Sequence, residues 1–396
     1  MTGPLSGIRV LDFTRHQQGP YATSLLADMG ATVLKVEPRV DGEWGRQTER
    51  DESGFSAYFE SYNRGKQSIT LDIRTPAGKK IVEQLAPRVD VVVENFRPGY
   101  MDRIGLGYEA LRALNSRLIY AAASAYGSKG PLAQRPGYDH IAQAVSGLMI
   151  EQAGGPGHDP VPALPGAADQ ISATMFAFGI ASALVARDRT GEGQKVEVSL
   201  LGSMVAFQGR QITRFLHTGK QGRQRWRRSP LYSHYQAADG WVAIAAQDPK
   251  RWVRLCNALE HPELVDDPRF VGPWERHHNA QELEDTLEAI FATRSVAEWM
   301  ERLTGEDLPS APVNDYRALV EGEDLPAQLA ANGYVATVEH PNLGTLRTAG
   351  IAVQMTGTPP GPAGHTPELG HQTEEVLLEL GYTWEEMEQL RRDEVI

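Results

Sequence analysis

About the first 200 residues alternate between short apolar strand patterns and helical patterns, and this alternation restricts the possible folds more than any other feature. The strand patterns lie at residues 8–13, 32–37, 89–93, 118–123 and 195–200. Residues 89–93 are almost wholly apolar, as is typical of a strand in a parallel sheet that is covered on both faces. Alternating strands and helices predict an α/β fold with an open parallel sheet of Rossmann-like character.

Three loops that follow these strands form the expected binding region, since ligands of such sheets bind beyond the carboxyl ends of the strands. They are residues 14–18, 37–39 and 95–99. A dinucleotide-binding dehydrogenase is one alternative for this pattern, but its first loop should read G-x-G-x-x-G. Residues 14–20 read TRHQQGP, with one glycine and a proline where the phosphate would approach. The sequence therefore argues against a dinucleotide site.

The segment from residue 165 to 203 carries the strongest chemical signal. Asp169 stands just before an apolar run at residues 171–185, and a basic, glycine-containing turn leads from that run to the strand at 195–200. We expect a buried helix with Asp169 at its N-terminus, where backbone N–H groups and the helix dipole keep a carboxylate ionised. Such a carboxylate can attack an activated acyl group. From the residues alone, a simple helix cap is the other interpretation.

The composition is that of a soluble enzyme. The chain has 396 residues, 41% of them hydrophobic, enough for two domains with sizeable cores. A net charge of −12 argues against nucleic acid or anionic membranes as partners. The single cysteine, Cys256, and the absence of a signal-peptide pattern predict a cytoplasmic location. No run approaches 18 apolar residues, and no His or Cys spacing indicates a metal site.

The predicted domain organisation rests on a change of sequence pattern near residue 209, where the alternation of strand and helix patterns ends. Residues 210–228 are basic and irregular, and a hairpin with a turn at Asp239-Gly240 follows them. The predicted order is a large α/β domain, a linker, a small α+β domain, a return linker and C-terminal helices that rejoin the large domain. Their predicted bounds are residues 1–205, 206–225, 226–325, 326–366 and 367–396.

Residues 165–203 resemble the class III CoA-transferases, a family that includes formyl-CoA and carnitine CoA-transferases and has alpha-methylacyl-CoA racemases as relatives. Further matching segments occur in order along almost the whole chain. They are residues 5–14 (LSGIRVLDFT), 26–37 (LADMGATVLKVE), 63–72 (NRGKQSITLD), 94–99 (ENFRPG), 135–139 (RPGYD) and 367–380 (PELGHQTEEVLLEL). The resemblance implies an enzyme that moves CoA between an acyl-CoA donor and a carboxylic-acid acceptor, and a homodimer of two interlocked, ring-like subunits. CoA is the co-substrate, and no metal is implied.

The resemblance also assigns roles to individual residues. Asp169 is the implied nucleophile, which forms first an anhydride with the acyl group and then a thioester with CoA. Gln17 follows the first strand, where its amide could donate to a carboxylate or an oxyanion, and backbone N–H donors are expected near Asp169. Arginines suit the phosphates of CoA. The implied CoA-binding residues are Arg15, His16, Arg39, Leu71, Arg74, Asn95, Phe96, Arg97, Arg103, Tyr138 and Asp139.

Departures from the family pattern leave two alternatives and one open question. The racemases carry a histidine where this chain has Tyr138, and tyrosine is a poor base near neutral pH. A non-catalytic CoA-binding protein would need the CoA loops but neither Asp169 nor Gln17. Residues 222–232 (GRQRWRRSPLY) lack the glycine run of formyl-CoA transferases. The arginines there, Arg223, Arg225, Arg227 and Arg228, could bind CoA phosphates, recognise a second carboxylate, or simply be solvated.

Overall fold

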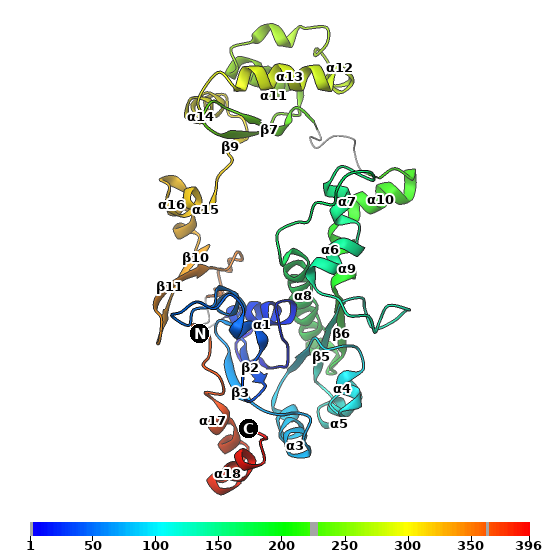
Figure 1. The fold of residues 1–396 in the computed structure, drawn as a ribbon, viewed down its shortest axis with the longest axis vertical. Helices are drawn as coiled ribbons and strands as arrows, with labels where there is room; N and C mark the ends of the chain where they lie inside the picture. The colour runs from blue at the N-terminus through cyan, green and yellow to red at the C-terminus, as the bar shows by residue number, and fades with distance from the viewer. Residues whose placement is uncertain (1–2, 222–228, 362–363) are drawn as a thin grey trace. The chain divides into compact units, whose positions relative to one another are not determined.

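The computed structural model describes residues 3–221, 229–361 and 364–396, and its largest sheet has six parallel strands. They are β1 (Arg9–Asp12), β2 (Thr32–Glu37), β3 (Gln67–Thr70), β4 (Val91–Glu94), β5 (Ile119–Ser124) and β6 (Lys195–Ser199). Their order is β3-β2-β1-β4-β5-β6 (Figure 1). This is the order of Rossmann folds, so the predicted open parallel sheet is confirmed.

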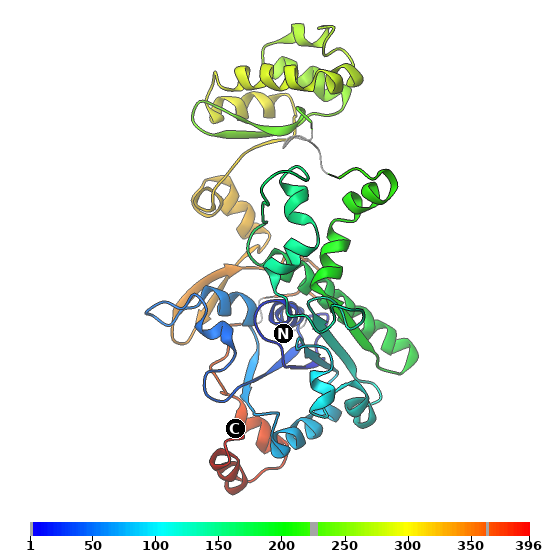
Figure 2. The same ribbon diagram turned by 45° about the vertical axis from the view of Figure 1, so that its right-hand side comes forward.

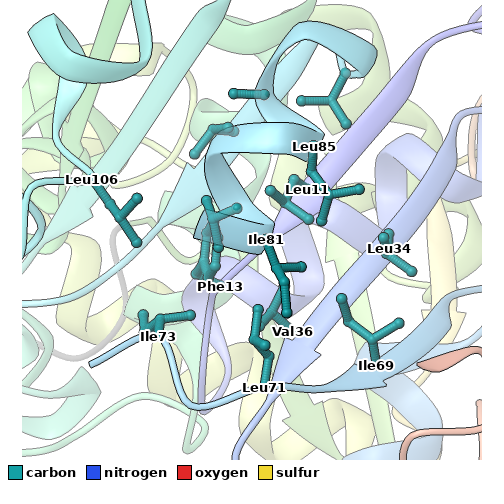
Figure 3. Packing of buried hydrophobic residues seen from close by; sticks show 14 of the residues in the cluster. Leu11, Phe13, Leu34, Val36, Ile69, Leu71, Ile73, Ile81, Leu85 and Leu106 are labelled. Atoms are coloured by element: carbon teal, nitrogen blue, oxygen red, sulfur yellow. The ribbon is translucent and has the colours of Figure 1, made fainter. Parts of the chain in front are cut away.

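The two faces of this sheet are covered by different helices. Leu11 faces the helix α3 (Pro76–Leu85), and Figure 3 shows Ile81 and Leu85 of that helix beside it. The C-terminal helices α17 (Thr373–Glu379) and α18 (Trp384–Arg392) join the same core. Since side chains alternate along a strand, the neighbouring Val10 belongs to the opposite core, with α1 (Gln18–Asp28) and α8 (Ala167–Thr190).

Helix α8 differs from the helix predicted at residues 171–185. It has 24 residues and runs between two glycines, Gly166 and Gly191, that both adopt the left-handed conformation. One side packs on α1 and on the sheet (Figure 2). The other side exposes apolar side chains, among them Phe178 and Val185, so the prediction of a buried helix is wrong for that side. By length and composition, α8 is long and apolar enough to cross a membrane.

The remaining helices of the first 221 residues lie between and after the strands. They are α2 (Ala57–Asn63), α4 (Tyr100–Arg103), α5 (Tyr108–Leu114), α6 (Asp139–Val145), α7 (Leu148–Gln152), α9 (Leu200–Phe207) and α10 (Gly209–Thr218), with short 3-10 helices at Trp44–Gln47 and Ala86–Arg88. The helix α10 lies where the sequence predicted an irregular segment.

The chain forms two compact units. Unit 1 comprises residues 1–151, 159–221 and 329–396, and unit 2 comprises residues 152–158 and 222–328. The predicted linkers 206–225 and 326–366 therefore fall largely within unit 1. The second of them contains a hairpin of β10 (Val335–His340) and β11 (Gly344–Ala349).

Unit 2 is an antiparallel sheet covered by helices. Its strands are β7 (Tyr232–Gln236), β8 (Trp241–Ala245) and β9 (Ser310–Pro312). Its helices are α11 (Pro249–Ala258), α12 (Pro273–His278), α13 (Ala280–Phe291), α14 (Val296–Gly305) and α15 (Tyr316–Glu321), and α16 (Asp324–Ala331) spans the boundary with unit 1. Trp252, Phe291 and Trp299 are buried in its core. The turn at Asp239-Gly240 joins β7 to β8 as predicted.

Candidate active site

A buried charge network fixes the loop that follows β1. Asp12 ends this strand, and its Oδ1 accepts the backbone N–H of Thr14 at 2.8 Å. Its Oδ2 accepts from the Thr23 hydroxyl at 2.7 Å and from Lys66 Nζ at 3.1 Å. Burial alone would raise the pKa of Asp12, but the charges of Lys66 and Lys35 hold that pKa below its usual range. The loop that follows β1 therefore begins at an ionised carboxylate, that of Asp12, whose hydrogen bonds fix its position.

His16, in the loop after β1, has an unusual backbone conformation that its neighbours hold in place. Its φ is +67°, in the left-handed region that residues other than glycine rarely occupy. Its backbone N–H donates to Glu43 Oε2 at 2.9 Å, which holds the turn in place. The imidazole lies 5.5 Å from the rings of both Trp44 and Tyr138. Desolvation lowers the pKa of His16. The strained turn therefore brings His16 to Tyr138 and leaves Gln17 at the start of α1.

Asn95 connects the loop after β1 to the loop after β4. Its Oδ1 accepts the backbone N–H of Arg15 at 2.9 Å, and its Nδ2 donates to the carbonyl of Arg15 at 2.8 Å. The Arg15 guanidinium lies over the ring of Phe96, 5.2 Å from its centroid. The order of the sheet reverses between β1 and β4, and ligands of such folds bind at that point.

A cleft in unit 1 opens beside these two loops. Its lining combines several predicted site residues with residues from β5, from the loop before α6 and from α9. The lining residues are His16, Gln18, Asn95, Phe96, Arg97, Pro98, Ser124, Ala125, Ala133, Arg135, Pro136, Gly137, Tyr138, Asp169 and Leu200.

Asp169 lies in the first turn of α8, but it does not cap the helix. The N-cap position is Gly166, and the carboxylate that accepts from the helix N-terminus is Asp139 of α6. Asp139 Oδ1 accepts from the N–H groups of Ala168 at 2.7 Å and Asp169 at 3.3 Å, and its Oδ2 accepts from Gly166 at 3.0 Å. The expectation that these N–H groups hold Asp169 ionised is therefore wrong, whereas the expectation of backbone N–H donors near Asp169 stays a prediction.

The environment of Asp169 favours its protonated form more than usual. Among the described residues its carboxyl oxygens have no hydrogen-bond partner. Burial, followed by the nearby negative charge of Asp139, raises the pKa of Asp169 to about 7. An unpartnered carboxyl group with a pKa near neutrality, at the wall of a cleft, has the character of a reacting group and not of a structural cap.

The side chain of Gln17 contacts Gly166, the residue at the N-cap of α8. Its Nε2 donates to the hydroxyl of Tyr62 at 2.9 Å and lies 3.4 Å from the carbonyl oxygen of Gly166. The same Tyr62 hydroxyl accepts from Gln170 Nε2 at 3.2 Å. The side chain of Gln17 is buried beside Gly166, although it does not line the cleft.

The arginines predicted to bind CoA fall into two groups, those that form an ion pair within the described residues and those that do not. Arg39 pairs with Glu394 at 3.0 Å, and Arg74 pairs with Asp72 at 2.7 Å. Within the described residues, the guanidinium groups of Arg97 and Arg103 have no ion-pair partner, although Arg103 lies over the ring of Tyr100, 5.9 Å from its centroid. Positive charge without a protein counter-charge is therefore available along the loop that begins at Asn95.

The structure thus brings only part of the predicted set to the cleft. Asp169, His16, Asn95, Phe96, Arg97 and Tyr138 line it, whereas Gln17, Arg15 and Asp139 are not among the lining residues and bond to their neighbours. Leu71 is buried in the core, and Arg39, Arg74 and Arg103 do not line this cleft. Arg223, Arg225, Arg227 and Arg228 lie outside the described residues.

The polar residues of the site that sequence reasoning missed include Arg135, Tyr62 and Gln170. Arg135 lines the cleft and has no ion-pair partner among the described residues; its signal was its place in the RPGYD segment. Tyr62 and Gln170 join Gln17, and only the adjacency of Gln170 to Asp169 was visible in the sequence. Across the described residues, no group of three or more His, Cys, Asp or Glu side chains is arranged to hold a metal ion.

The fold and the site define an α/β protein with an unpartnered carboxyl group of raised pKa beside cationic loops at the switch point of a Rossmann-ordered sheet. The model of CoA-transferase family III matches residues 5–373, and the chain belongs to this family. It is similar to succinyl-CoA:glutarate CoA-transferase of Mus musculus, with 36% identity over 387 residues that cover 95% of this chain and 86% of the relative. It is also similar to succinyl-CoA:mesaconate CoA-transferase of Haloarcula hispanica, with 35% identity over 96% of this chain and 97% of the relative.

Other relatives and solved structures agree with this assignment. Acetyl-CoA:oxalate CoA-transferase of Acetobacter aceti is 36% identical over 83% of this chain and 85% of its own length. The crystal structure of Rv3272 from Mycobacterium tuberculosis has a TM-score of 0.84 at 31% identity, covering 94% of this chain and 99% of that one. The chain is therefore a CoA-transferase, an enzyme that moves CoA between carboxylic acids.

Proposed function

We propose that Asp169 is the nucleophile of this CoA transfer. The observation that carries the proposal is its unpartnered carboxyl group at the wall of the cleft that Arg97 and Arg135 also line. A structural carboxylate in such a place would be hydrogen-bonded, as Asp139 is. Asp169 has the reach and the freedom to attack a bound acyl group.

The proposed reaction proceeds through covalent intermediates. The Asp169 carboxylate attacks the thioester carbonyl of the donor, the C–S bond breaks, and CoA thiolate leaves an aspartyl–acyl anhydride. The thiolate then attacks the aspartyl carbonyl and releases the donor acid, which leaves a thioester between Asp169 and CoA. The acceptor carboxylate attacks the aspartyl carbonyl of this thioester, the C–S bond breaks, and CoA thiolate leaves a second anhydride. A final attack of the thiolate on the acceptor's acyl carbonyl gives the new acyl-CoA and restores Asp169.

Each of these attacks places negative charge on a carbonyl oxygen, which a nearby donor must stabilise. The N–H groups at the start of α8 are already used by Asp139. We therefore assign this role to the amide of Gln17, whose bond to the Gly166 carbonyl is long, at 3.4 Å, and easily exchanged. This assignment keeps Gln17 in the catalytic role expected from the sequence.

CoA itself is proposed to lie along the loops after β1 and β4. Arg97 and Arg135 are the best-placed partners for its phosphates, because they line the cleft and carry no ion pair among the described residues. Arg15, His16, Asn95, Phe96 and Tyr138 would form the adjoining walls. Arg39, Leu71, Arg74, Arg103 and Asp139 remain predicted contacts.

The proposed acceptor and donor include dicarboxylic acids. Glutarate, oxalate and mesaconate, which appear in the names of the relatives, all carry two carboxylates. The arginines at 223, 225, 227 and 228 are the proposed recognition group for the second carboxylate. A panel of mono- and dicarboxylic acids of equal chain length, assayed with succinyl-CoA, should show the lower KM for the dicarboxylic member of each pair.

A homodimer and a cytoplasmic location complete the proposal. Exposed apolar side chains on α8, α9 and α10 support a second copy of the chain as partner, and the single buried cysteine is consistent with a reducing compartment. The interlocked arrangement is the one that the family resemblance implies.

The nucleophile can be tested by mass spectrometry. When the enzyme is incubated with acyl-CoA and no acceptor acid, the peptide that contains Asp169 should gain the mass of CoA less one water. An acceptor labelled with ¹⁸O should leave label in the same peptide after turnover. Asp169→Asn should show neither and should not transfer CoA. Asp188→Asn, an exposed site on the same helix, should behave as the wild type. A CoA adduct on any other residue, or an active Asp169→Asn enzyme, would refute the assignment.

A further inference from the structure

Tyr62, at the end of α2, joins the two sides of the site through one hydroxyl group. Its Oη accepts from Gln17 Nε2 at 2.9 Å, and Gln17 comes directly after the loop that follows β1. It also accepts from Gln170 Nε2 at 3.2 Å, and Gln170 follows Asp169 on α8. No other described side chain bonds to both Gln17 and α8.

The ring of Tyr62 is held firmly enough to act as a support. It packs edge-on against Tyr21, with centroids 5.6 Å apart, and against Tyr58, with centroids 5.0 Å apart. A hydroxyl has two acceptor sites and one donor, so two amide donors fill its acceptor capacity. Burial raises the pKa of Tyr62 above its ordinary value, so the phenol stays protonated throughout the neutral range and this bonding pattern does not change with pH.

The orientation of the Gln17 amide follows from its two neighbours. Its nitrogen is the atom near the carbonyl oxygen of Gly166, since the reverse orientation would place two acceptors against each other. A Cβ at position 166 would lie 2.2 Å from Gln17 Nε2, so the amide occupies space that only a glycine leaves open. Of its two N–H groups, one is fixed by Tyr62 and the other is only weakly engaged, at 3.4 Å from Gly166.

We propose that Tyr62 is a positioning residue that fixes the amide of Gln17, so that its second N–H is presented to the carboxylate or oxyanion at Asp169. The inference rests on the catalytic role proposed for Gln17 and adds the residue that makes this role possible. Without the Tyr62 hydroxyl, the amide can rotate about its last torsion, and the donor is no longer preorganised. Gln170, which shares the hydroxyl, keeps Tyr62 in register with the helix that carries Asp169.

The test is a double-mutant cycle with Tyr62→Phe and Gln17→Ala. The Tyr62→Phe variant removes the hydroxyl group and keeps the ring contacts. Tyr62→Phe should lower kcat/KM for the acceptor acid about tenfold, the size expected for one well-placed hydrogen bond. The KM for the donor acyl-CoA should stay within about twofold, because no proposed CoA contact involves Tyr62. In a Gln17→Ala background, Tyr62→Phe should have no further effect. Tyr382→Phe is the matched control, since it removes a hydroxyl bonded to Gln84 at 2.8 Å, away from the cleft.

A second cycle tests the other donor to the hydroxyl. Gln170→Ala should lower the same kcat/KM by a smaller factor, and this loss should also vanish in the Tyr62→Phe background. Two results would overturn the positioning role of Tyr62 and leave the role of Gln17 intact. One is that the effects of Tyr62→Phe and Gln17→Ala on kcat/KM are fully additive. The other is that Tyr62→Phe is fully active whereas Gln17→Ala is slow. A Gln17→Ala enzyme with wild-type activity overturns the proposed role of Gln17 as well, so the two failures are distinguishable.

Discussion

At the scale of the residue, the chemistry depends on which of two neighbouring carboxylates accepts the N–H groups at the start of α8. Asp139 accepts three of them, so its two carboxylate oxygens take the donors at the start of this helix. Burial, followed by the negative charge of Asp139, raises the pKa of Asp169 to about 7, and none of these N–H groups donates to its carboxyl oxygens. A higher pKa makes a carboxylate a stronger nucleophile once it is ionised, while the fraction ionised falls.

This pKa predicts the pH dependence of CoA transfer. Because only ionised Asp169 can attack, kcat/KM for the acyl-CoA should rise about tenfold per pH unit below about 7 and become constant above it. The profile is measured between pH 5 and 9 under conditions in which the enzyme stays folded. An activity that is constant down to pH 5 would mean that Asp169 is ionised in the free enzyme and that its environment is more polar than described.

The arginines give a second prediction at this scale. Arg97 and Arg135 line the cleft without an ion pair among the described residues, so each is free to bind a CoA phosphate. Arg97→Ala and Arg135→Ala should each raise the KM for acyl-CoA about tenfold, as expected for a lost charge-assisted hydrogen bond, with a smaller change in kcat.

Arg74→Ala is the comparison, because Arg74 is already bonded twice to Asp72, at 2.9 and 2.7 Å. Its effect on the KM for acyl-CoA should be smaller than that of either cleft arginine. The three variants are compared in steady-state kinetics with CoA binding measured by calorimetry. A larger effect at Arg74 than at Arg97 would instead place the phosphates toward β3.

At the scale of the element, α8 begins without a cap of its own. Gly166 has no side chain, and Asp139 of α6 supplies the cap from a different segment. Gln143 on α6 donates to the same Asp139 carboxylate at 2.9 Å, which fixes its orientation. The capping contact therefore sets both the position of the first turn of α8 and the charge next to Asp169.

Asp139→Asn should separate these two effects. The amide can accept through one oxygen only, so the free energy of unfolding should fall by about 1 kcal/mol. The loss of the negative charge should lower the pKa of Asp169 and move the acid limb of kcat/KM to lower pH. Thr383→Ala removes the capping box of α18, away from the cleft, and is the matched control. It should lower stability to a similar extent without moving the pH profile, and a shift in that variant would show that stability alone explains the result.

The elements were predictable where local pattern determines structure. Residues 32–37 form β2 as expected, and Thr75 caps α3 through a bond to Gly78 at 3.0 Å. The cap of α8 was not predictable, because Asp139 lies 30 residues before Asp169 and only the packing of α6 on α8 brings them together. The exposed side of α8 was missed for a related reason: a uniformly apolar run does not tell which of its faces the same chain covers.

At the scale of the whole molecule, unit 1 exposes large apolar side chains on three consecutive helices. Phe178 on α8 is 71% exposed, Phe207 on α9 is 57% exposed and Leu216 on α10 is 78% exposed. Exposed apolar side chains that gather on consecutive helices mark a protein interface more often than free surface. Helix α8 also carries Asp169, so an interface there would couple the assembly of the site to that of the dimer.

The enzyme is therefore expected to sediment as a homodimer at sub-micromolar concentration. Phe178→Asp would place a charge on the proposed interface, where desolvation is costly, and should shift the equilibrium toward monomer. Leu114→Asp, at the end of α5, changes an apolar side chain that is 46% exposed and should leave the dimer intact. Sedimentation velocity at several concentrations, with the activity of each species, measures both effects. If Phe178→Asp stays dimeric, the partner does not use this face of α8, and a stable, active monomer of the wild type would refute the dimer itself.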